Sequence, residues 1–507
     1  MADVALRRNL TEWLLMEFGS DKVLVDPEDL YVYSFYGEFA SRRHPNLVAV
    51  LRRLSPEDEG RLAKIAEASR VPIIRTGELG LKETDGPALL VDVRTPPSRE
   101  SLLERLRLME QDEAEGKRRL REATSLPARL VSSLRMADGF RLRGLDDPDN
   151  GYCIMQPHYD GVETYSSKGR LLFSRGLLEG ELPVTDKLVD SLYTCTACGQ
   201  CYGQVSLEGF EINNAIVRAR NEVVKSGVSP RNSRPLVDSI MGEGNPMGMP
   251  AEDRAMWYEG LAEERPYDGN DVLYWPGCST SYRLPGIVES TAKILEEAEV
   301  DFGLLGEEEG CCGLVLYLLG LWDEAAENAS RTVESLHGMG VKRLVTGCAG
   351  CYYAFTKVYR RMNVERPFEV HHTSQMMESL VRDGALDLGE QRGRYVWHDP
   401  CDLGRHSGVY EPPRNVLRAI PGLELVEPPL RKEHALCCGG GGGLMVYDEG
   451  LAEKVAHQKL LEDVSPLQVD GVVTGCPACI LSMRNASRLL KMDIQVLDLA
   501  EVISRSL

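Results

Sequence analysis

The sequence predicts an α/β protein of several domains, in which the last two domains are copies of one repeat. Three observations lead to this prediction. Ten of the 14 cysteines form a pattern that occurs twice, short apolar segments run directly into these cysteines, and helix-like stretches separate the segments. Strands that alternate with helices are typical of parallel sheets. A chain of 507 residues is long enough for several such domains.

Residues 1–120 contain no cysteine and are expected to form a small α+β domain. The apolar residues 47–51 and 71–74 predict strands, and Ser55-Pro56-Glu57 between them opens a predicted helix. Residues 88–93 are a further strand candidate. The dense Glu, Arg and Lys content of residues 101–120 predicts an exposed helix.

Four further regions follow along the chain. Residues 121–150 mix Arg, Asp, Gly and Pro and are expected to be a connector. Residues 151–265 hold four cysteines outside the repeated pattern. The first copy of the repeat spans residues 270–385, and the second copy spans residues 394–507.

In each copy, one predicted strand runs into the first cysteine and another runs into a C-x-x-C pair. These segments are residues 271–278 and 343–348 in the first copy, and residues 394–401 and 470–476 in the second. Parallel sheets gather ligands at the carboxyl ends of their strands. A C-x-x-C pair that opens a helix also gains from the helix N-terminus, which stabilises thiolate. An apolar stripe with the 3.6-residue period predicts a helix between the segments, with Trp322, Ala325, Ala326, Ala329, Val333 and Leu336.

Each copy brings five thiols together, with gaps of 32 and 35 residues in the first copy and 35 and 37 in the second. The first set is Cys278, Cys311, Cys312, Cys348 and Cys351; the second set is Cys401, Cys437, Cys438, Cys476 and Cys479. An ordinary four-iron cluster or a structural zinc needs only four. Zinc on the two C-x-x-C pairs would leave six cysteines unexplained, and disulfide bonding is the other alternative. The glycines 439–443 either let backbone approach a cofactor or form a flexible loop.

These residues resemble the CCG domains of the heterodisulfide reductase family. The matching pieces are WPGC, GCCG and TGCAGC in the first copy, and HDPC, LCCGGGGG and TGCPAC in the second. The resemblance implies that each set holds a noncubane [4Fe–4S] cluster ligated by five thiolates, and that the ten cysteines are catalytic. In relatives that act as electron relays, such as the iron–sulfur subunit of glycolate oxidase, some of these cysteines are lost, whereas both sets are intact here.

The four remaining cysteines are expected to hold one cubane [4Fe–4S] cluster, in a helical, ferredoxin-like domain over residues 151–265. Cys195, Cys198 and Cys201 form the first three positions of a bacterial-ferredoxin run, but Val205 stands where the fourth cysteine is expected. In two-cluster ferredoxins, the fourth cysteine of one run ligates the cluster of the other run. Cys153 is the upstream cysteine that could fill this place, and residues 153–171 resemble the segment that follows such a cysteine in this family. A buried cysteine without a ligand role is the alternative for Cys153.

The N-terminal region is similar to the opening of the flavin domain of glycolate and D-lactate dehydrogenases, over residues 26–38 and 45–74. The glycine-rich flavin loop is expected next, but residues 75–86 do not match it. We therefore interpret the N-terminal region as a degenerate flavin domain that binds no FAD and docks a partner subunit.

Several residues other than cysteine are also candidates. His398, Arg405 and His406 flank Cys401 and could donate a proton to a nascent thiolate or bind an anionic substrate group, or simply pack in a loop. A structural role is favoured for the histidine pair at residues 371–372, and a place in the core is favoured for the tyrosine pair at residues 352–353.

The formal charge of −20 argues against nucleic acid as a partner and against a polybasic contact with lipid. No run of about eighteen apolar residues predicts a membrane span. Glu12 interrupts the apolar residues near the N-terminus and no small-residue cleavage site follows, so no secretory signal is expected. A cytoplasmic protein is expected, with any membrane association made through a partner.

The prediction for function is an oxidoreductase subunit of heterodisulfide reductase type. Electrons would pass from the cubane to the two noncubane clusters, which would reduce a small disulfide or a thiol-level substrate. The alternative is an electron relay that links a flavoprotein, either a 2-hydroxyacid dehydrogenase or an electron-transfer flavoprotein, to a quinone or another carrier. The expected partner is an electron-donor or acceptor subunit of flavoprotein, ferredoxin-like or membrane-cytochrome type.

Overall fold

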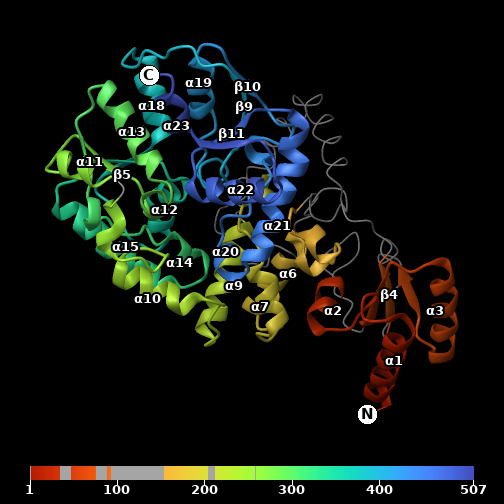
Figure 1. Cartoon of the computed structure of the whole chain (residues 1–507). Helices are drawn as coiled ribbons and strands as arrows, with labels where there is room; N and C mark the ends of the chain where they lie inside the picture. The colour runs from red at the N-terminus through yellow and green to blue at the C-terminus, as the bar shows by residue number, and fades with distance from the viewer. Residues whose placement is uncertain (1, 35–46, 76–87, 93–152, 204–211, 257) are drawn as a thin grey trace, which may run out of the picture. The chain divides into compact units, whose positions relative to one another are not determined.

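The computed structural model describes residues 2–34, 47–75, 88–92, 153–203, 212–256 and 258–507. The chain divides into two compact units, each of which is described by itself. The smaller unit is formed by residues 1–192 and 204–216, and the larger unit by residues 193–203 and 217–507. Figure 1 shows the smaller unit mainly in red to yellow, and the larger unit mainly in green to blue.

The smaller unit contains a four-stranded sheet with the strand order β1-β2-β4-β3. Its strands are β1 (Val23–Leu24), β2 (Leu47–Arg52), β3 (Ile73–Arg75) and β4 (Ala88–Asp92). Helix α3 (Pro56–Ser69) connects β2 to β3, and it begins with a capping box in which Ser55 and Asp58 each accept from the backbone N–H of the other. The strands and helix expected at residues 47–51, 55–57 and 71–74 are therefore confirmed, although the strand of the last segment spans residues 73–75, and the strand expected at residues 88–93 is confirmed as far as residue 92. The predicted features at residues 76–86, 101–120 and 121–150 lie outside the described residues.

Helices complete the smaller unit. They are α1 (Ala2–Phe18), α2 (Pro27–Ser34), η3 (Gln156–Tyr159), η4 (Glu163–Tyr165), α6 (Ser167–Leu178) and α7 (Asp186–Tyr193), whose last residue belongs to the larger unit. The buried Asp29 of α2 accepts hydrogen bonds from Thr164 and Lys187. Tyr31, also on α2, donates to Glu181 at 2.8 Å. These contacts join the N-terminal segment to the segment that follows Cys153.

The larger unit contains two parallel four-stranded sheets with the same topology. Their orders are β6-β5-β7-β8 and β10-β9-β11-β12, so that in each copy the first and third strands are central neighbours. The first sheet has β5 (Val272–Trp275), β6 (Phe302–Gly303), β7 (Arg343–Thr346) and β8 (Glu369–His372). The second has β9 (Gly393–Trp397), β10 (Leu423–Val426), β11 (Gly471–Thr474) and β12 (Gln495–Asp498). The predicted α/β class with two repeated domains is confirmed.

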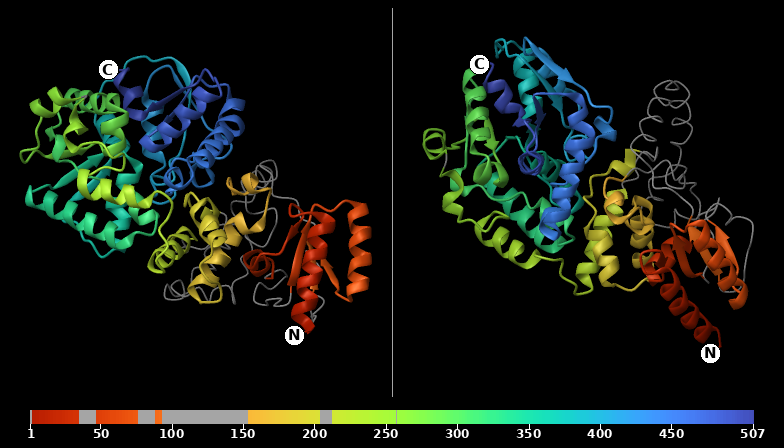
Figure 2. Two further views of the ribbon diagram at one scale, coloured as in Figure 1. Left: turned by 60° about the horizontal axis from the view of Figure 1, so that its bottom comes forward. Right: turned by 45° about the vertical axis from the view of Figure 1, so that its right-hand side comes forward.

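Helices cover the sheets of both copies, and they pack the two copies against each other. Helix α13 (Pro285–Glu297) of the first copy packs on α23 (Leu499–Ser504) of the second, and α18 (Thr373–Arg382) packs on α19 (Glu411–Ala419). The green and blue copies accordingly lie side by side in each view of Figure 2. The helix expected over residues 322–336 is α15 (Trp322–Gly338).

The larger unit contains further α-helices. They are α8 (Gln200–Gly203), α9 (Ile212–Lys225), which begins in the smaller unit, α10 (Ser233–Glu243), α11 (Glu259–Glu264), α12 (Cys278–Arg283), α14 (Leu314–Leu318), α16 (Ala349–Tyr353), α17 (Tyr359–Arg361), α20 (Leu444–Tyr447), α21 (Glu449–Lys459) and α22 (Pro477–Leu489). Among the described residues, no helix is both long enough and apolar enough to cross a membrane.

Candidate metal centres

The carboxyl ends of the central strands bring the cysteines of each copy together. In the first copy, Trp275 of β5 pairs with Thr346 of β7, so Cys278 and Cys348 follow from neighbouring strand ends. Cys278 begins helix α12, and Cys348 is the N-cap residue of α16. In the second copy, Cys476 is the N-cap residue of α22. Both C-x-x-C pairs therefore open helices, as the sequence predicts, and the helix N-terminus favours thiolate there.

The five sulfurs of the first set lie in a series of neighbours. The Sγ atoms of Cys278 and Cys311 are 4.0 Å apart. Hydrogen-bonded contacts continue from Cys311 to Cys312, from Cys312 to Cys351 and from Cys351 to Cys348. The backbone N–H of Gly313 donates to Cys311 Sγ at 3.4 Å.

The second set repeats this series position by position. Its order is Cys401, Cys437, Cys438, Cys479 and Cys476. The Sγ atoms of Cys438 and Cys479 are 3.1 Å apart. Backbone N–H groups of Gly439 and Gly440 donate to Cys437 Sγ and Cys438 Sγ, each at 3.4 Å. Two segments that are far apart in the sequence thus build the same arrangement of five thiols.

The thiols of each set differ in pKa, and the pKa of the same position is lowered in both. The pKa of Cys312 is lowered to about 6, because its sulfur accepts hydrogen bonds from the thiols of Cys311 and Cys351. The pKa of Cys438 is lowered for the same reason by Cys437 and Cys479. Ionising all five thiols of a set would place five negative charges in one buried volume, so full deprotonation requires bound cations.

A buried arginine lies near the first set. Arg254 and Glu309 form an ion pair at 3.0 Å in which both side chains are almost fully buried, and Glu309 also accepts from the backbone N–H of Gly277 at 2.9 Å. Burial raises the pKa of Glu309 to about 7. The Glu309 carboxylate and the nearby sulfur of Cys278 both favour the charged form of Arg254. A fixed positive charge of this kind offsets part of the charge of neighbouring thiolates.

The segment Cys195–Cys201 lies against the second set. The thiol of Cys198 hydrogen-bonds with Cys437, and this contact raises the pKa of Cys198 well above its usual value. The guanidinium of Arg405 donates to the carbonyl oxygen of Cys198 at 2.7 Å, and His406 Nε2 lies 3.0 Å from the carbonyl oxygen of Ala197. Burial lowers the pKa of His406 to about 3. Arg405 and His406 therefore position the cysteine segment on the second copy, and His406 is a neutral imidazole near pH 7.

Arg220 on α9 ties the same segment to both copies. Its guanidinium donates to the carbonyl oxygens of Cys195 at 2.5 Å, Leu318 at 2.6 Å and Gly442 at 2.8 Å. It also lies 5.0 Å from the ring centroid of Tyr193. Arg220 was not predicted from the sequence. Arg220 lies on the apolar face of α9, and a charged residue is rarely buried on such a face unless it is paired. This pattern in the sequence could have identified Arg220 as a residue with a specific buried partner.

The glycine run after Cys438 makes close backbone contacts. A Cβ on Gly442 would lie 1.9 Å from the carbonyl oxygen of Thr196, and a Cβ on Gly440 would lie 2.6 Å from that of Ala478. Gly441, in contrast, has no atom within 4 Å of such a position. Gly442 also has a φ of +68°, which favours glycine. The absence of a side chain at Gly442 therefore lets the cysteine segment of residues 195–201 pack closely against the glycine run. A flexible loop without a ligand does not account for this close contact.

Cys153 lies in the smaller unit, whereas Cys195, Cys198 and Cys201 lie in the larger one. One terminal nitrogen of Arg170, Nη1, is 3.7 Å from Cys153 Sγ, and Arg170 Nε donates to the carbonyl oxygen of Ser191 at 2.8 Å. A cluster shared by the four cysteines stays a prediction.

The remaining candidates have clear local surroundings. His372 is the N-cap residue of α18, its Nε2 lies 3.0 Å from the carbonyl oxygen of Gly475, and burial lowers its pKa to about 4. His371 lies beside Glu369, with its side chain 42% exposed. The tyrosines at residues 352–353 are both buried, as expected for core residues. His398 is buried next to the second set.

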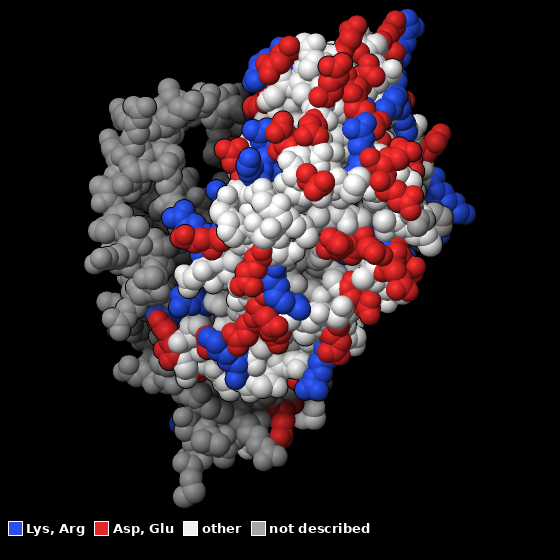
Figure 3. Space-filling view, turned by 90° about the vertical axis from the view of Figure 1, so that its left-hand side faces the viewer, with Lys and Arg blue, Asp and Glu red and all other residues white. Residues whose placement is uncertain are grey.

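The surface of the described residues carries both signs of charge. On the face shown in Figure 3, acidic and basic side chains lie interspersed, and no broad basic area is visible on that face. A partner that docks there would meet individual charges of either sign.

Comparison with known proteins gives a consistent result. The family described as "Cysteine-rich domain" (CCG) matches residues 272–356 and 395–484. The chain is 31% identical to one subunit of the dihydromethanophenazine:CoB–CoM heterodisulfide reductase of Methanosarcina acetivorans, over 68% of this chain and 84% of that protein. It is 31% identical to the EtfAB:quinone oxidoreductase of Syntrophomonas wolfei, over 63% of this chain and 47% of that protein. It is 28% identical to one subunit of the fumarate reductase (CoM/CoB) of Methanothermobacter marburgensis, over 62% of this chain and 61% of that protein.

Proposed function

The chain belongs to the CCG-domain family of heterodisulfide reductase subunits and is an iron–sulfur oxidoreductase subunit; from this premise we propose that its two five-thiol sets each bind a noncubane [4Fe–4S] cluster and that these clusters reduce a disulfide. The observation that carries the proposal is the repetition of one five-sulfur arrangement in both copies. A tetrahedral zinc site would use four thiolates and leave a fifth buried thiol without a role.

The residues around the two sets suit a cluster of thiolate-bound iron. The sulfurs lie in buried volumes, backbone N–H groups point at three of them, and the guanidinium groups of Arg254 and Arg405 lie beside them. Hydrogen bonds to cluster sulfur, burial and nearby charge are the features by which proteins adjust cluster potentials. When bound, the clusters supply the electrons for the reaction.

The reaction we propose consumes two electrons and two protons for each disulfide. The S–S bond breaks and two S–H groups form, so that R–S–S–R′ becomes R–SH and R′–SH. Burial excludes bulk water from the sets, which limits side reactions. The reverse direction, in which two thiols are oxidised, uses the same site.

Electrons reach the sets from a cubane held by Cys153, Cys195, Cys198 and Cys201 in this proposal. The contact between the thiols of Cys198 and Cys437 supports the second set as the place where electrons arrive. Cys153→Ala is expected to remove or destabilise the cubane signal in electron paramagnetic resonance (EPR). An unchanged cubane signal in that variant would show that Cys153 is not a ligand.

The main test is chemical analysis of anaerobically purified protein. One cubane and two four-iron clusters require about 12 iron and about 12 acid-labile sulfide per chain. Cys312→Ala and Cys438→Ala are each expected to lose about four of each. The two variants control each other, because each removes a central thiol of one set and leaves the other set complete. Stoichiometric zinc with little iron would contradict the proposal.

A second candidate function is an electron relay without disulfide chemistry. The likeness to an EtfAB:quinone oxidoreductase favours it. In that case, the partners would be a flavoprotein and a quinone-reducing or membrane-cytochrome subunit. EPR of the oxidised protein with a panel of small thiols separates the two functions: a new thiol-dependent paramagnetic signal supports disulfide chemistry, and no response to any thiol supports the relay.

A further inference from the structure

The two copies share all five cysteine positions but differ at the residue three positions before the first cysteine. This residue is Trp275 in the first copy and His398 in the second. The sheets show that the positions correspond. Trp275 pairs with Thr346 across the first sheet, and Thr474 Oγ1 donates to the carbonyl oxygen of His398 at 3.1 Å in the second. Thr346 and Thr474 stand at the same place in the two TGC segments.

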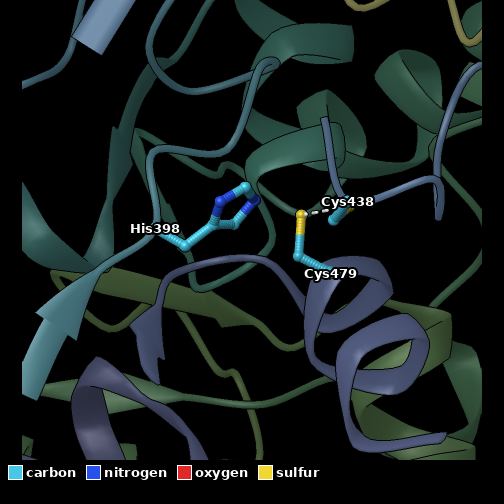
Figure 4. A group of neighbouring side chains, drawn as sticks. All are labelled: His398, Cys438 and Cys479. Atoms are coloured by element: carbon cyan, nitrogen blue, oxygen red, sulfur yellow. Dashed lines mark hydrogen bonds between the residues drawn. The ribbon is translucent and has the colours of Figure 1, made fainter. Parts of the chain in front are cut away.

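The side chain of His398 lies next to two sulfurs of the second set. A ring nitrogen of His398 and the Sγ atoms of Cys438 and Cys479 all lie within 4.8 Å of one another, and all three residues are buried. Figure 4 shows the imidazole edge pointing toward Cys479 and Cys438, with the ring arriving from the strand end and Cys479 from the start of α22. This spacing can accommodate a metal ion that binds one nitrogen and two sulfurs, because metal–sulfur and metal–nitrogen bonds are each about 2 Å long.

The backbone on both sides of His398 holds the ring in this direction. The N–H of His398 donates to the carbonyl oxygen of Val473 at 2.9 Å. The next residue, Asp399, accepts from Trp397 Nε1 at 3.1 Å and from both terminal nitrogens of Arg414 at 2.7 Å. The ring is therefore presented to the sulfurs by a rigid element, as metal ligands usually are.

The Nδ1 atom of His398 is buried without a hydrogen-bond partner among the described residues. A neutral imidazole offers one nitrogen lone pair to a metal.

The corresponding side chain of the first copy cannot do this. Trp275 Nε1 is also buried without a partner among the described residues, and a Cβ on Gly277 would lie 3.9 Å from this nitrogen and 3.1 Å from Cys351 Sγ. The indole nitrogen therefore lies on the side of the first set. An indole N–H is a donor only, so it can hydrogen-bond to cluster sulfur but cannot ligate iron.

We propose that His398 is a nitrogen ligand of the cluster in the second set, so that the two clusters are chemically different despite their identical sets of five thiols. This inference rests on the proposed cluster in the second copy. The ligands around an iron–sulfur cluster are among the features that set its reduction potential. The second cluster would then differ in potential from the first, which would order the flow of electrons between them.

The test uses the full chain, purified anaerobically after labelling with ¹⁵N-histidine. Pulsed EPR of the paramagnetic five-thiolate clusters is expected to show a strong coupling to histidine nitrogen, and His398→Trp, which installs the residue of the first copy, is expected to lose it. His371→Phe, at an exposed histidine, is the matched control and should keep the coupling. If His398→Trp does not fold, Trp275→His provides a second measurement, since a further histidine coupling is expected at the first cluster.

The outcomes separate this inference from the proposed function. Full iron and sulfide content with no histidine coupling in the unsubstituted protein, or a coupling that survives in His398→Trp, would overturn the ligand assignment and leave the clusters in place. Absence of iron in the second set would overturn both.

Discussion

Arg220 offers the sharpest test of how the cysteine segment of residues 195–201 is held. Its guanidinium is fully buried and donates to three carbonyl oxygens, one from the cysteine segment and one from each copy of the repeat. In Arg220→Ala, these carbonyl groups lose a charged donor in a place that water does not readily reach. The matched control is Arg218→Ala, because Arg218 is exposed on the same helix.

The magnitude follows from the three hydrogen bonds. Each bond to a charged donor contributes about 1.5–3 kcal/mol net, so Arg220→Ala is expected to lower the free energy of unfolding by about 4.5–9 kcal/mol. At roughly 2 °C per kcal/mol for a large domain, the midpoint of thermal unfolding falls by about 9–18 °C. Arg218→Ala is expected to change it by about 1 °C or less, because exposed substitutions have small effects.

Differential scanning calorimetry under anaerobic conditions measures the midpoints, and EPR measures the cubane in the same samples. We expect Arg220→Ala to lose cubane signal before it loses the signals of the five-thiolate clusters, because the carbonyl oxygen of Cys195 is released directly. An Arg220→Ala midpoint equal to that of Arg218→Ala, with an intact cubane, would refute the role of Arg220.

Two further predictions concern single positions in the second copy. Gly442→Ala is expected to destabilise the larger unit or displace the cysteine segment, because the new Cβ would lie 1.9 Å from the carbonyl oxygen of Thr196. The control, Gly441→Ala, should fold normally because no atom lies within 4 Å of its Cβ position. Equal cubane content and equal midpoints of thermal unfolding in the two variants would contradict this prediction. Burial raises the pKa of Asp498 from 3.8 to about 8, so the native state holds a proton that the unfolded state releases above about pH 4, and the free energy of unfolding falls as pH rises from about 4 to 8. Asp498→Asn, which can still cap α23 by accepting from Ala500, is expected to remove this slope in chemical unfolding measured at about pH 5 and about pH 8; an unchanged slope would contradict the assignment to Asp498.

Much of the fold could be predicted because its signals are local. The strands that end near Cys278, Cys348, Cys401 and Cys476 carry continuous apolar residues, and the C-x-x-C pairs lie at helix starts where the sequence places them. The repeat made the second sheet predictable from the first, because equal spacing implies equal topology. The five-thiol sets follow from that topology, since neighbouring parallel strands end at the same edge of a sheet.

The contacts that hold the cysteine segment could not be predicted, because they join residues that are distant in the sequence. Arg405 and His406 were considered as proton donors because they follow Cys401, yet both bind carbonyl oxygens of residues 197–198. Arg220 contacts Leu318, which is 98 positions away, and no local pattern encodes such a partner. For the same reason, the role of the glycine run depends on Thr196, which a spacing argument cannot supply.

Two differences between the copies would give electrons a direction. Identical sets of thiols alone would give two clusters of similar potential, and transfer between equivalent clusters has no preferred direction. The residue at the end of the central strand breaks the equivalence, because Trp275 offers only an N–H whereas His398 offers a nitrogen lone pair. The contact of Cys198 with Cys437 breaks it again, since it places the cysteine segment beside the second set. Both differences fall on the same copy: the set that lies against the cysteine segment is also the set that an imidazole ligand would distinguish from its counterpart. Its place beside the cysteine segment makes the second set the one suited to receive electrons first.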